Sequence, residues 1–362
     1  MTKLSAKKII LQQLVSIAIA IGLFAAAFGP GLPYVRLSPG TAYDATGSAD
    51  GTEIISVENT KDFPTYKVNG HMLMLTVTEW GAPYGHLAWT DALRSVWDRA
   101  IVVHPSSFFY PDGADYEADV QQGYDDIHLA EQQAIGAVFH YMNKPIKSVL
   151  RVDDFAEDFP AVKHLKLGDV VISVDGKKVT TYLEFEAATK DVKAGQSTTW
   201  VVKRQGKEVT TAFAPIDDGY EGVAFGVKIQ EVYSPPMKLK WNLASVGGPS
   251  GGLAFALALY EKFSKEDLLR GRTIAVTGTI SEEDGFVDAI GGIDQKLALA
   301  ARSGAKLMLI PGMNCSDIDA PIPPELTVVP VYHLDEAIDM LRKPDGYKKF
   351  PTCEDEANSV GW

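Results

Sequence analysis

Cysteine is scarce in this chain of 362 residues, which contains only Cys315 and Cys353. The two stand in no C-x-x-C spacing and no cluster of histidines accompanies them, so the sequence offers no zinc site. We therefore expect no metal and no other cofactor. An oxidising compartment permits a disulfide between the two residues, and the alternative of two unpaired thiols stays equally open.

Positive charge is also in short supply, with 34 Lys and Arg against 47 Asp and Glu and a formal net charge of -13. Such a surface repels polyphosphates, so nucleic acid is not expected as a partner. No Gly-Lys-Ser/Thr follows a glycine-rich loop, so ATP hydrolysis is not expected either. A hydrophobic share of 46% excludes a disordered chain, and the length suits two or three domains.

Charge is absent from residues 9–28, IILQQLVSIAIAIGLFAAAF, and lysines precede this run in residues 1–8. Its length of about 20 residues matches the ~30 Å hydrocarbon layer of a bilayer. The positive-inside rule then places the N-terminus in the cytoplasm and the rest outside. A signal peptide cleaved near Ala25–Ala27 is the alternative, but the run is longer than the usual ~7 to 15 apolar residues. We therefore expect a single-pass anchor in the cell membrane, with an extracytoplasmic catalytic part.

The following segments differ in character. Residues 29–45 are rich in Pro and Gly and predict a linker. Within residues 46–144, Asn69-Gly70 predicts a hairpin over Tyr66–Thr78, and Ala88–Val103 has a helical composition. Apolar residues at helical spacing predict an amphipathic helix over Tyr116–Tyr141.

Residues 145–213 predict a small β-rich domain, with two strands joined at Gln205-Gly206. The run LKLGDVVISVDGKKV, residues 165–179, resembles PDZ domains. This resemblance implies binding of an extended peptide as an added strand. The acidic loop DDFAEDFPA, residues 153–161, is longer than the turn common in that family, so the peptide-binding residues stay unassigned. A β-rich spacer that binds nothing is the alternative.

Residues 214–342 alternate strands and helices, and residues 343–362 form a C-terminal tail. In GGPSGGLAFALALYEKF, glycines permit a sharp turn into a hydrophobic helix with Ser250 at its start. Free amides there, near Gly248 and Ser250, suit a developing oxyanion. A plain serine N-cap is the bland alternative. The Gly-x-Ser-x-Gly pattern also fits an α/β-hydrolase, for which His333 is the sole later histidine.

A lysine stands on an apolar helix face. A strand over Ile274–Thr277 leads through Gly291-Gly292 into a helix over Ile293–Ser303, where Lys296 shares a stripe with apolar residues. An isolated lysine in such a place usually extends its amine to solvent. Burial, however, lowers the pKa of a lysine from ~10.4 and converts it into a general base for a serine hydroxyl.

Together these segments resemble Lon-type serine peptidases, and among them the exported PDZ-containing Lon-like peptidases of bacteria. The resemblance rests on GGPSGGLAFAL, TGTI, IGGIDQK, AARSGAKLMLIP and VVPVYHLDEAI. It implies that Ser250 is the nucleophile, Lys296 its base and Thr277 a hydroxyl partner of the lysine. Gly251 stands where alanine is usual, a small change in a turn that is not expected to abolish activity.

The sequence therefore predicts an α+β protein with a transmembrane helix, a PDZ-like module and a Lon-type α/β peptidase domain. Residues 46–144 are expected to pack on the peptidase domain, which would make the PDZ-like module an insertion. The expected activity is ATP-independent serine endopeptidase action on extracytoplasmic proteins or peptides. Two alternatives are an exported α/β-hydrolase using Ser250 and His333, and a non-catalytic membrane-anchored PDZ scaffold. A homo-oligomer is left open.

Overall fold

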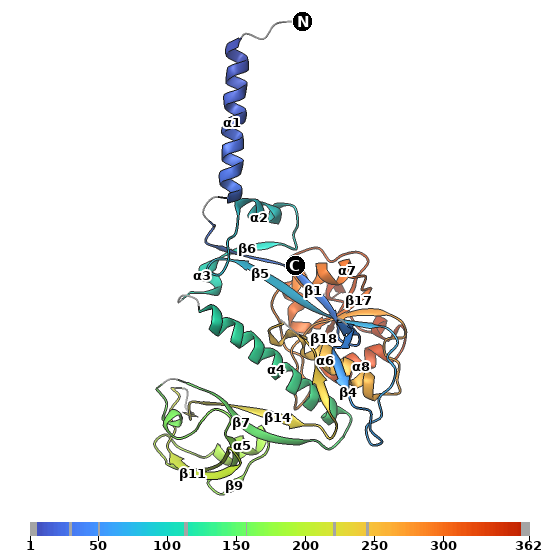
Figure 1. Ribbon diagram of the computed structural model, residues 1–362. Coiled ribbons are helices and arrows are strands. Elements are labelled where there is room, and N and C mark those ends of the chain that lie inside the picture. Colours follow the sequence, from blue (N-terminus) through green and yellow to red (C-terminus); the bar gives the residue numbers. More distant parts are fainter. Residues whose placement is uncertain are drawn as a thin grey trace.

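The computed structural model describes residues 6–28, 31–49, 51–111, 115–156, 158–219, 222–243 and 246–355. The predicted cytoplasmic N-terminus and the C-terminal tail lie partly outside these residues. The linker predicted over residues 29–45 is mostly wrong, because Tyr34–Asp44 form a paired strand, β1, within it. Helix α1, Ala6–Phe28, stands as a rod away from the rest of the chain (Figure 1). Across the described residues, no helix is both long and apolar enough to cross a membrane. The anchor and the location stay predictions.

One six-stranded sheet combines strands from both ends of the chain, in the order β18-β17-β16-β5-β1-β6. Strands β16, β17 and β18 are parallel to one another, β5 is parallel to β16, and β1 is antiparallel to β5 and β6. The bounds are β1 Tyr34–Asp44, β5 His71–Gly81, β6 Val102–Pro105, β16 Thr273–Val276, β17 Leu307–Pro311 and β18 Thr327–Val331. The N-terminal region therefore supplies half of this sheet.

The hairpin expected at Asn69-Gly70 is wrong. Gly70 instead leads into the single long strand β5, whose partners β1 and β16 lie far away in the sequence. Strand β16 pairs with only the first four residues of β5, His71 to Met74. Beyond Met74, no strand in the described part of the chain pairs with that edge of β5. Backbone groups on this edge are therefore open to a further extended segment.

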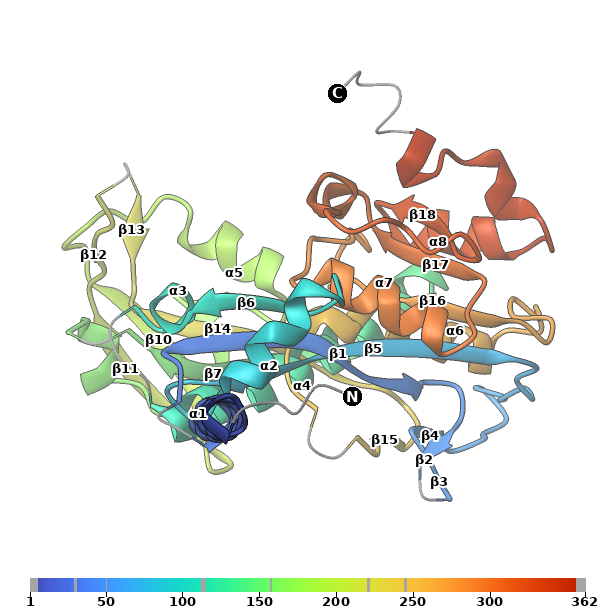
Figure 2. The same cartoon turned by 90° about the horizontal axis from the view of Figure 1, so that it is seen from above.

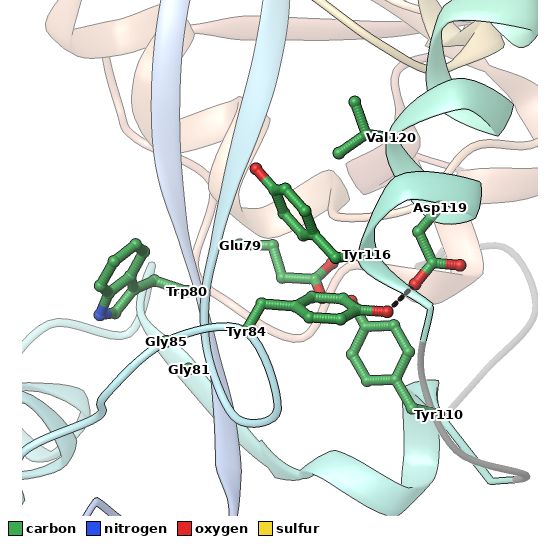
Figure 3. Close-up of a pocket in the computed structure, with 9 residues that line it drawn as sticks. All are labelled: Glu79, Trp80, Gly81, Tyr84, Gly85, Tyr110, Tyr116, Asp119 and Val120. Atoms are coloured by element: carbon green, nitrogen blue, oxygen red, sulfur yellow. Dashed lines mark hydrogen bonds between the residues drawn. The ribbon is translucent and has the colours of Figure 1, made fainter.

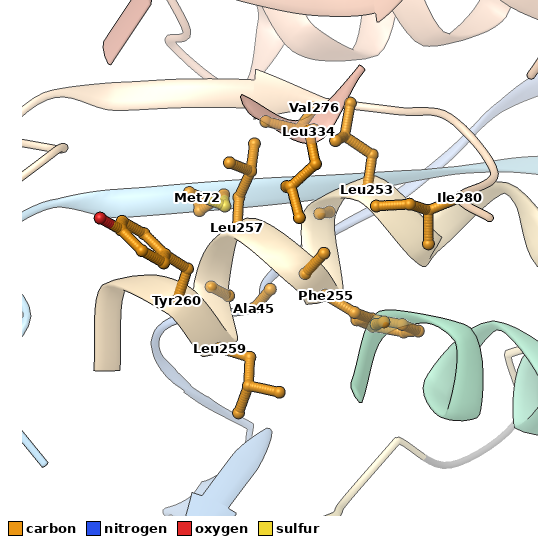
Figure 4. Close-up of a cluster of buried hydrophobic side chains, with 14 of the residues drawn as sticks. Ala45, Met72, Leu253, Phe255, Leu257, Leu259, Tyr260, Val276, Ile280 and Leu334 are labelled. Atoms are coloured by element: carbon orange, nitrogen blue, oxygen red, sulfur yellow. The ribbon is translucent and has the colours of Figure 1, made fainter. Parts of the chain in front are cut away.

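The expected helix over Tyr116–Tyr141 is present with those bounds as α4. It packs on α6, Gly252–Phe263, which is buried on every side as its all-round hydrophobic sequence indicates. Figure 4 shows Leu253, Phe255 and Leu257 of α6 projecting to different sides into the shared core. Two further helices, α7 Ile293–Arg302 and α8 Leu334–Leu341, complete this part of the chain.

A second sheet, in the order β11-β10-β8-β7-β14 with β9 beside β8, forms the PDZ-like module. Its strands are β7 Lys147–Phe155, β8 Val170–Val174, β9 Lys177–Lys178, β10 Thr198–Arg204, β11 Lys207–Phe213 and β14 Val227–Ser234, and its helix is α5 Tyr182–Thr189. A core around Trp200 and Phe185 holds it together. Strand β14 lies beyond Phe213, the boundary expected from the sequence.

Short elements make up the remainder. They are α2 Trp89–Leu93, α3 Ser106–Phe109, β2 Ser48–Ala49, β3 Thr52–Glu53, β4 Ile55–Val57, β12 Ile216–Asp217, β13 Val223–Ala224, β15 Leu239–Trp241 and five 3-10 turns among the described residues, η1 Arg94–Val96, η2 Pro160–Lys163, η3 Pro249–Gly251, η4 Gly312–Asp317 and η5 Gly346–Lys349. The helix expected over Ala88–Val103 is therefore mostly wrong, because α2 ends early and β6 pairs with β1.

In the sequence, the PDZ-like module lies between the segment that supplies β1, β5 and β6 and the segment that supplies β16, β17 and β18. In space, α4 runs between the two sheets (Figures 1 and 2). The chain enters the module directly after α4 and returns through β14 and β15. A disulfide joins Cys315 to Cys353, which settles the alternative left open for the two cysteines.

Candidate active site

The loop before α6 holds Ser250 in a fixed backbone position. Gly248 has φ 91° and ψ 154°, a conformation that suits glycine, and a 3-10 turn over Pro249–Gly251 follows it. The carbonyl of Ser250 accepts hydrogen bonds from the amide of Gly278 at 2.9 Å and from Thr277 Oγ1 at 3.2 Å. Thr277 and Gly278, which follow β16, therefore hold the backbone of Ser250 in place.

Lys296 is buried, with only 2% of its surface exposed. Its Nζ donates a hydrogen bond to Thr277 Oγ1 at 3.1 Å, in agreement with the partner that the resemblance implied. Among the described residues no carboxylate pairs with it. Desolvation lowers the pKa of Lys296 to about 7, so a large part of the amine is neutral at neutral pH.

A glycine permits the start of α7 to approach β5. Gly292 has φ 69°, and a Cβ atom there would lie 2.6 Å from Val77 Cγ2. Its carbonyl accepts the amide of Lys296 at 3.1 Å, in the first turn of α7. This close packing holds the first turn of α7, which contains Lys296, against β5.

Ser250 and Lys296 line one cavity of about 240 Å³. Its other walls are Met74, Leu75, Thr76 and Val77 of β5, Ile127 of α4, Gly291, and Val246, Gly247, Gly248, Pro249 and Gly251 of the serine loop. Within the described residues, no hydrogen bond joins the Ser250 hydroxyl to Lys296 Nζ. Such contacts are often loose in unliganded enzymes and shorten when substrate is bound.

The two amides expected to bind an oxyanion differ in their surroundings. The amide of Gly248 donates to the carbonyl of Gly123 on α4 at 2.9 Å, so it is occupied in this arrangement. The amide of Ser250 donates to no group in the described part of the chain. In this arrangement the Ser250 amide is free to bind an oxyanion, whereas the Gly248 amide becomes free only when α4 or the loop shifts.

His333 does not join this group. It stands immediately before α8, its ring lies 5.4 Å from that of Phe286, and it is absent from the walls of the cavity that contains Ser250. The structure therefore does not bring together the two residues on which the α/β-hydrolase alternative depends.

Some residues at the site were missed by reasoning from sequence. Gly123 and Ile127 come from α4, whose apolar spacing indicated a packed helix but not what it packs against. Met74 explains the glycine at position 251, because a Cβ there would lie 2.6 Å from the Met74 sulfur. The side chain of Met74, on β5, therefore fills the space beside the serine loop.

The PDZ-like module has a groove of its own, of about 660 Å³, between α5 and the strands β13 and β14. Tyr182, Leu183, Phe185, Glu186, Ala187, Thr189, Lys190, Val223, Phe225 and Val227 line it. Strand β14 is at the end of its sheet, so it has an edge facing away from β7. Near α4, the Tyr233 amide on this strand donates to Gln132 Oε1 at 2.8 Å.

Two segments of this chain match known protein domains. Residues 244–343 match the Lon protease (S16) C-terminal proteolytic domain, and residues 134–213 match the PDZ domain. The chain carries a Lon-type proteolytic domain and a PDZ domain. The first match covers the serine loop, Thr277 and Lys296.

Curated relatives named Lon protease match this proteolytic part. One from Xanthomonas oryzae is 39% identical over 28% of this chain and 12% of its own length. Lon protease 1 of Myxococcus xanthus is 33% identical over 36% of this chain and 16% of its own length. The chain therefore spans only a small share of these Lon-type relatives. A solved PDZ domain of an SdrC-like protein from Listeria monocytogenes covers 22% of this chain and 85% of its own length at 21% identity, with a TM-score of 0.21.

Proposed function

We propose that this Lon-type chain is an ATP-independent serine endopeptidase that uses a dyad of Ser250 and Lys296. The carrying observation is that Lys296, buried and with a pKa of about 7, opens into the same cavity as Ser250. A lysine that is partly neutral near pH 7 is a competent general base, whereas an exposed lysine is not. The match to a Lon proteolytic domain supports the same assignment.

In this proposal Ser250 Oγ attacks the carbonyl carbon of the scissile peptide bond, while Lys296 Nζ takes the hydroxyl proton. The resulting oxyanion is held by the Ser250 amide, joined by the Gly248 amide once Gly123 releases it. The protonated Lys296 then gives its proton to the leaving amine, which leaves an acyl group on Ser250. Water, activated by the same lysine, hydrolyses this ester and restores the hydroxyl.

Thr277 positions both members of the dyad. Its hydroxyl accepts from Lys296 Nζ and donates to the carbonyl of Ser250, so one side chain ties the two segments together. Because Lys296 is buried, the free rotation of its long side chain is already restricted before substrate arrives.

Other features support the proposed location and substrates of the peptidase. The uncharged run 9–28 supports a membrane anchor and an extracytoplasmic peptidase, and the Cys315–Cys353 disulfide suits an oxidising compartment. The groove between α5 and β14 suits an extended peptide that adds to the β14 edge, so the PDZ domain would present protein substrates.

The test is cleavage of an unstructured, internally quenched peptide by the full-length chain in detergent, without ATP. We expect cleavage by the wild type and none by Ser250→Ala, with Ser264→Ala as a matched serine control that stays active. A fluorophosphonate probe that labels the wild type but not Ser250→Ala would locate the nucleophile. If neither peptides nor proteins are cleaved and the probe labels nothing, the scaffold alternative replaces the peptidase.

A further inference from the structure

A second cavity, of about 550 Å³, lies along the same two elements as the first. Its walls are Glu79, Trp80, Gly81, Tyr84, Gly85, Tyr110, Tyr116, Asp119 and Val120. On β5, Glu79 lies two residues after Val77, which lines the first cavity, and so on the same face of the strand. On α4, Tyr116 and Val120 lie on one stripe with Ile127 of the first cavity. The two cavities are therefore neighbours between one strand and one helix.

Three tyrosines form the inner wall of this second cavity (Figure 3). The ring of Tyr84 lies 5.1 Å from that of Tyr110 and 5.0 Å from that of Tyr116, with both pairs meeting edge to face. Figure 3 shows Trp80 turned away from this group. We call Tyr84, Tyr110 and Tyr116, together with Glu79 and Asp119, the tyrosine cage.

Two carboxylates complete the cage. Tyr84 donates its hydroxyl to Asp119, and Tyr110 donates its hydroxyl to Glu79. Desolvation and the bonded carboxylate raise the pKa of Tyr84 to about 12, so its phenol stays neutral. The ion pairs formed among the described residues include neither of these carboxylates.

Such a cage selects for a cation with an apolar stem. Aromatic faces attract cations, and the two carboxylates add a formal charge that only a positive group offsets. A lysine or arginine side chain supplies both the stem and the charge. A choline lipid head group carries a phosphate beside its cation, and the carboxylates repel that phosphate.

We propose that the tyrosine cage is a specificity subsite that binds a basic side chain of the peptide substrate. This rests on the proposed function, because the cage adjoins the cavity of Ser250 and Lys296. The step from Val77 to Glu79 corresponds to roughly 7 Å of extended chain. A substrate lying along the open edge of β5 would therefore pass from the cavity of Ser250 to the cage and present its lysine or arginine there. The net charge of -13 favours basic substrates at a distance as well.

Binding tests the cage independently of catalysis. Fluorescein-labelled peptides that differ only by lysine or norleucine at one position are titrated onto full-length Ser250→Ala in detergent. We expect the best-placed lysine to lower the Kd by about tenfold relative to norleucine. Adding Glu79→Gln and Asp119→Asn keeps the hydrogen-bonding shape and should remove this preference, as should Tyr116→Leu in part. Asp126→Asn, a charge change on α4 outside the cage, should leave it intact.

Equal Kd values for the lysine and norleucine peptides at every position overturn the cage, as does a lysine preference that survives Glu79→Gln with Asp119→Asn. Phosphocholine binding that depends on these carboxylates, without any lysine preference, makes the cage a lipid site and also overturns it. The two proposals fail separately. A wild type that cleaves peptides without basic preference keeps the peptidase and removes the subsite. Carboxylate-dependent lysine binding without cleavage removes the peptidase and leaves the cage as a lysine-binding site alone.

Discussion

Gly123 on α4 accepts the amide of Gly248 in the serine loop at 2.9 Å, so a helix from the N-terminal half of the chain occupies one of the two expected oxyanion donors. The backbones are close enough that a Cβ on Gly247 would lie 3.2 Å from Gly123. In the proposed mechanism, full oxyanion binding therefore requires α4 and the loop to separate slightly, so that the Gly248 amide is released.

A larger side chain at position 123 tests whether α4 must separate from the serine loop for full activity. A Cβ at Gly123 meets Gly247 Cα at 3.6 Å, which is ordinary contact, but the further methyl groups of valine have no such room. We expect Gly123→Val to separate α4 from the loop and to raise kcat by about threefold, while Gly123→Ala changes it little. A fall in kcat in a variant that keeps its thermal stability would instead show that the Gly123–Gly248 bond belongs to the active state.

The proposed role of Lys296 as general base predicts how cleavage depends on pH. Only its neutral form accepts the Ser250 proton, and its pKa is about 7. We therefore expect kcat/KM to rise about tenfold per pH unit below pH 7 and to level off above about pH 8. The measurement is the rate of quenched-peptide cleavage from pH 5.5 to 9.5. A profile that falls as pH rises through 7 would mean that the protonated lysine is the active form.

Thr277 is expected to matter for catalysis more than for folding. Thr277→Val keeps the shape but removes the acceptor of Lys296 Nζ and one donor to the Ser250 carbonyl. We expect kcat to fall by about 10- to 100-fold, with a loss of stability of about 1–2 kcal/mol. Thr279→Val, two residues further along, is the control. If Thr277→Val is as active as the control Thr279→Val, Thr277 does not position the dyad.

Burial of Lys296 should cost stability. The unfolded chain holds its proton up to the ordinary pKa of 10.5, whereas the folded chain releases it near 7. Stability from this group is therefore lowest below pH 7 and recovers as pH rises toward 10.5. Lys296→Met should stabilise the peptidase domain by about 2–4 kcal/mol at pH 6, and by less at pH 9.

Calorimetric unfolding at both pH values measures this difference. Lys306→Met, at an exposed position, is the matched control and should shift neither transition. A Lys296→Met variant that unfolds earlier than the wild type at pH 6 would contradict the strained, partly neutral lysine.

Local patterns indicated both residues of the proposed dyad as candidates, and the resemblance to Lon-type peptidases paired them. The buried stripe of α7 and the glycine turn before α6 are each encoded within a few residues, so the sequence alone indicated Lys296 and Ser250 as candidates. Helix α4 was predicted correctly for the same reason. The resemblance added Thr277, which alone reads as an ordinary strand residue.

Long-range pairing was not predictable from these patterns. Asn69-Gly70 has the strongest local signal for a hairpin, yet β5 pairs with β1 and β16 because a buried sheet position outweighs a turn preference. The contact of Gly123 with Gly248 depends on the path of α4 between two sheets, and no short segment encodes it. The tyrosine cage likewise gathers Tyr84 from the turn after β5, Tyr110 from the residue after α3 and Tyr116 from the start of α4.

The choice of base is the central claim, and one comparison tests it most directly. Lys296→Ala and His333→Ala are assayed side by side on the same quenched peptide with the full-length chain. The buried amine in the cavity of Ser250 predicts that Lys296→Ala lowers kcat/KM by at least about a thousandfold, whereas His333→Ala retains most of it. Retained cleavage in Lys296→Ala with its loss in His333→Ala would contradict the dyad.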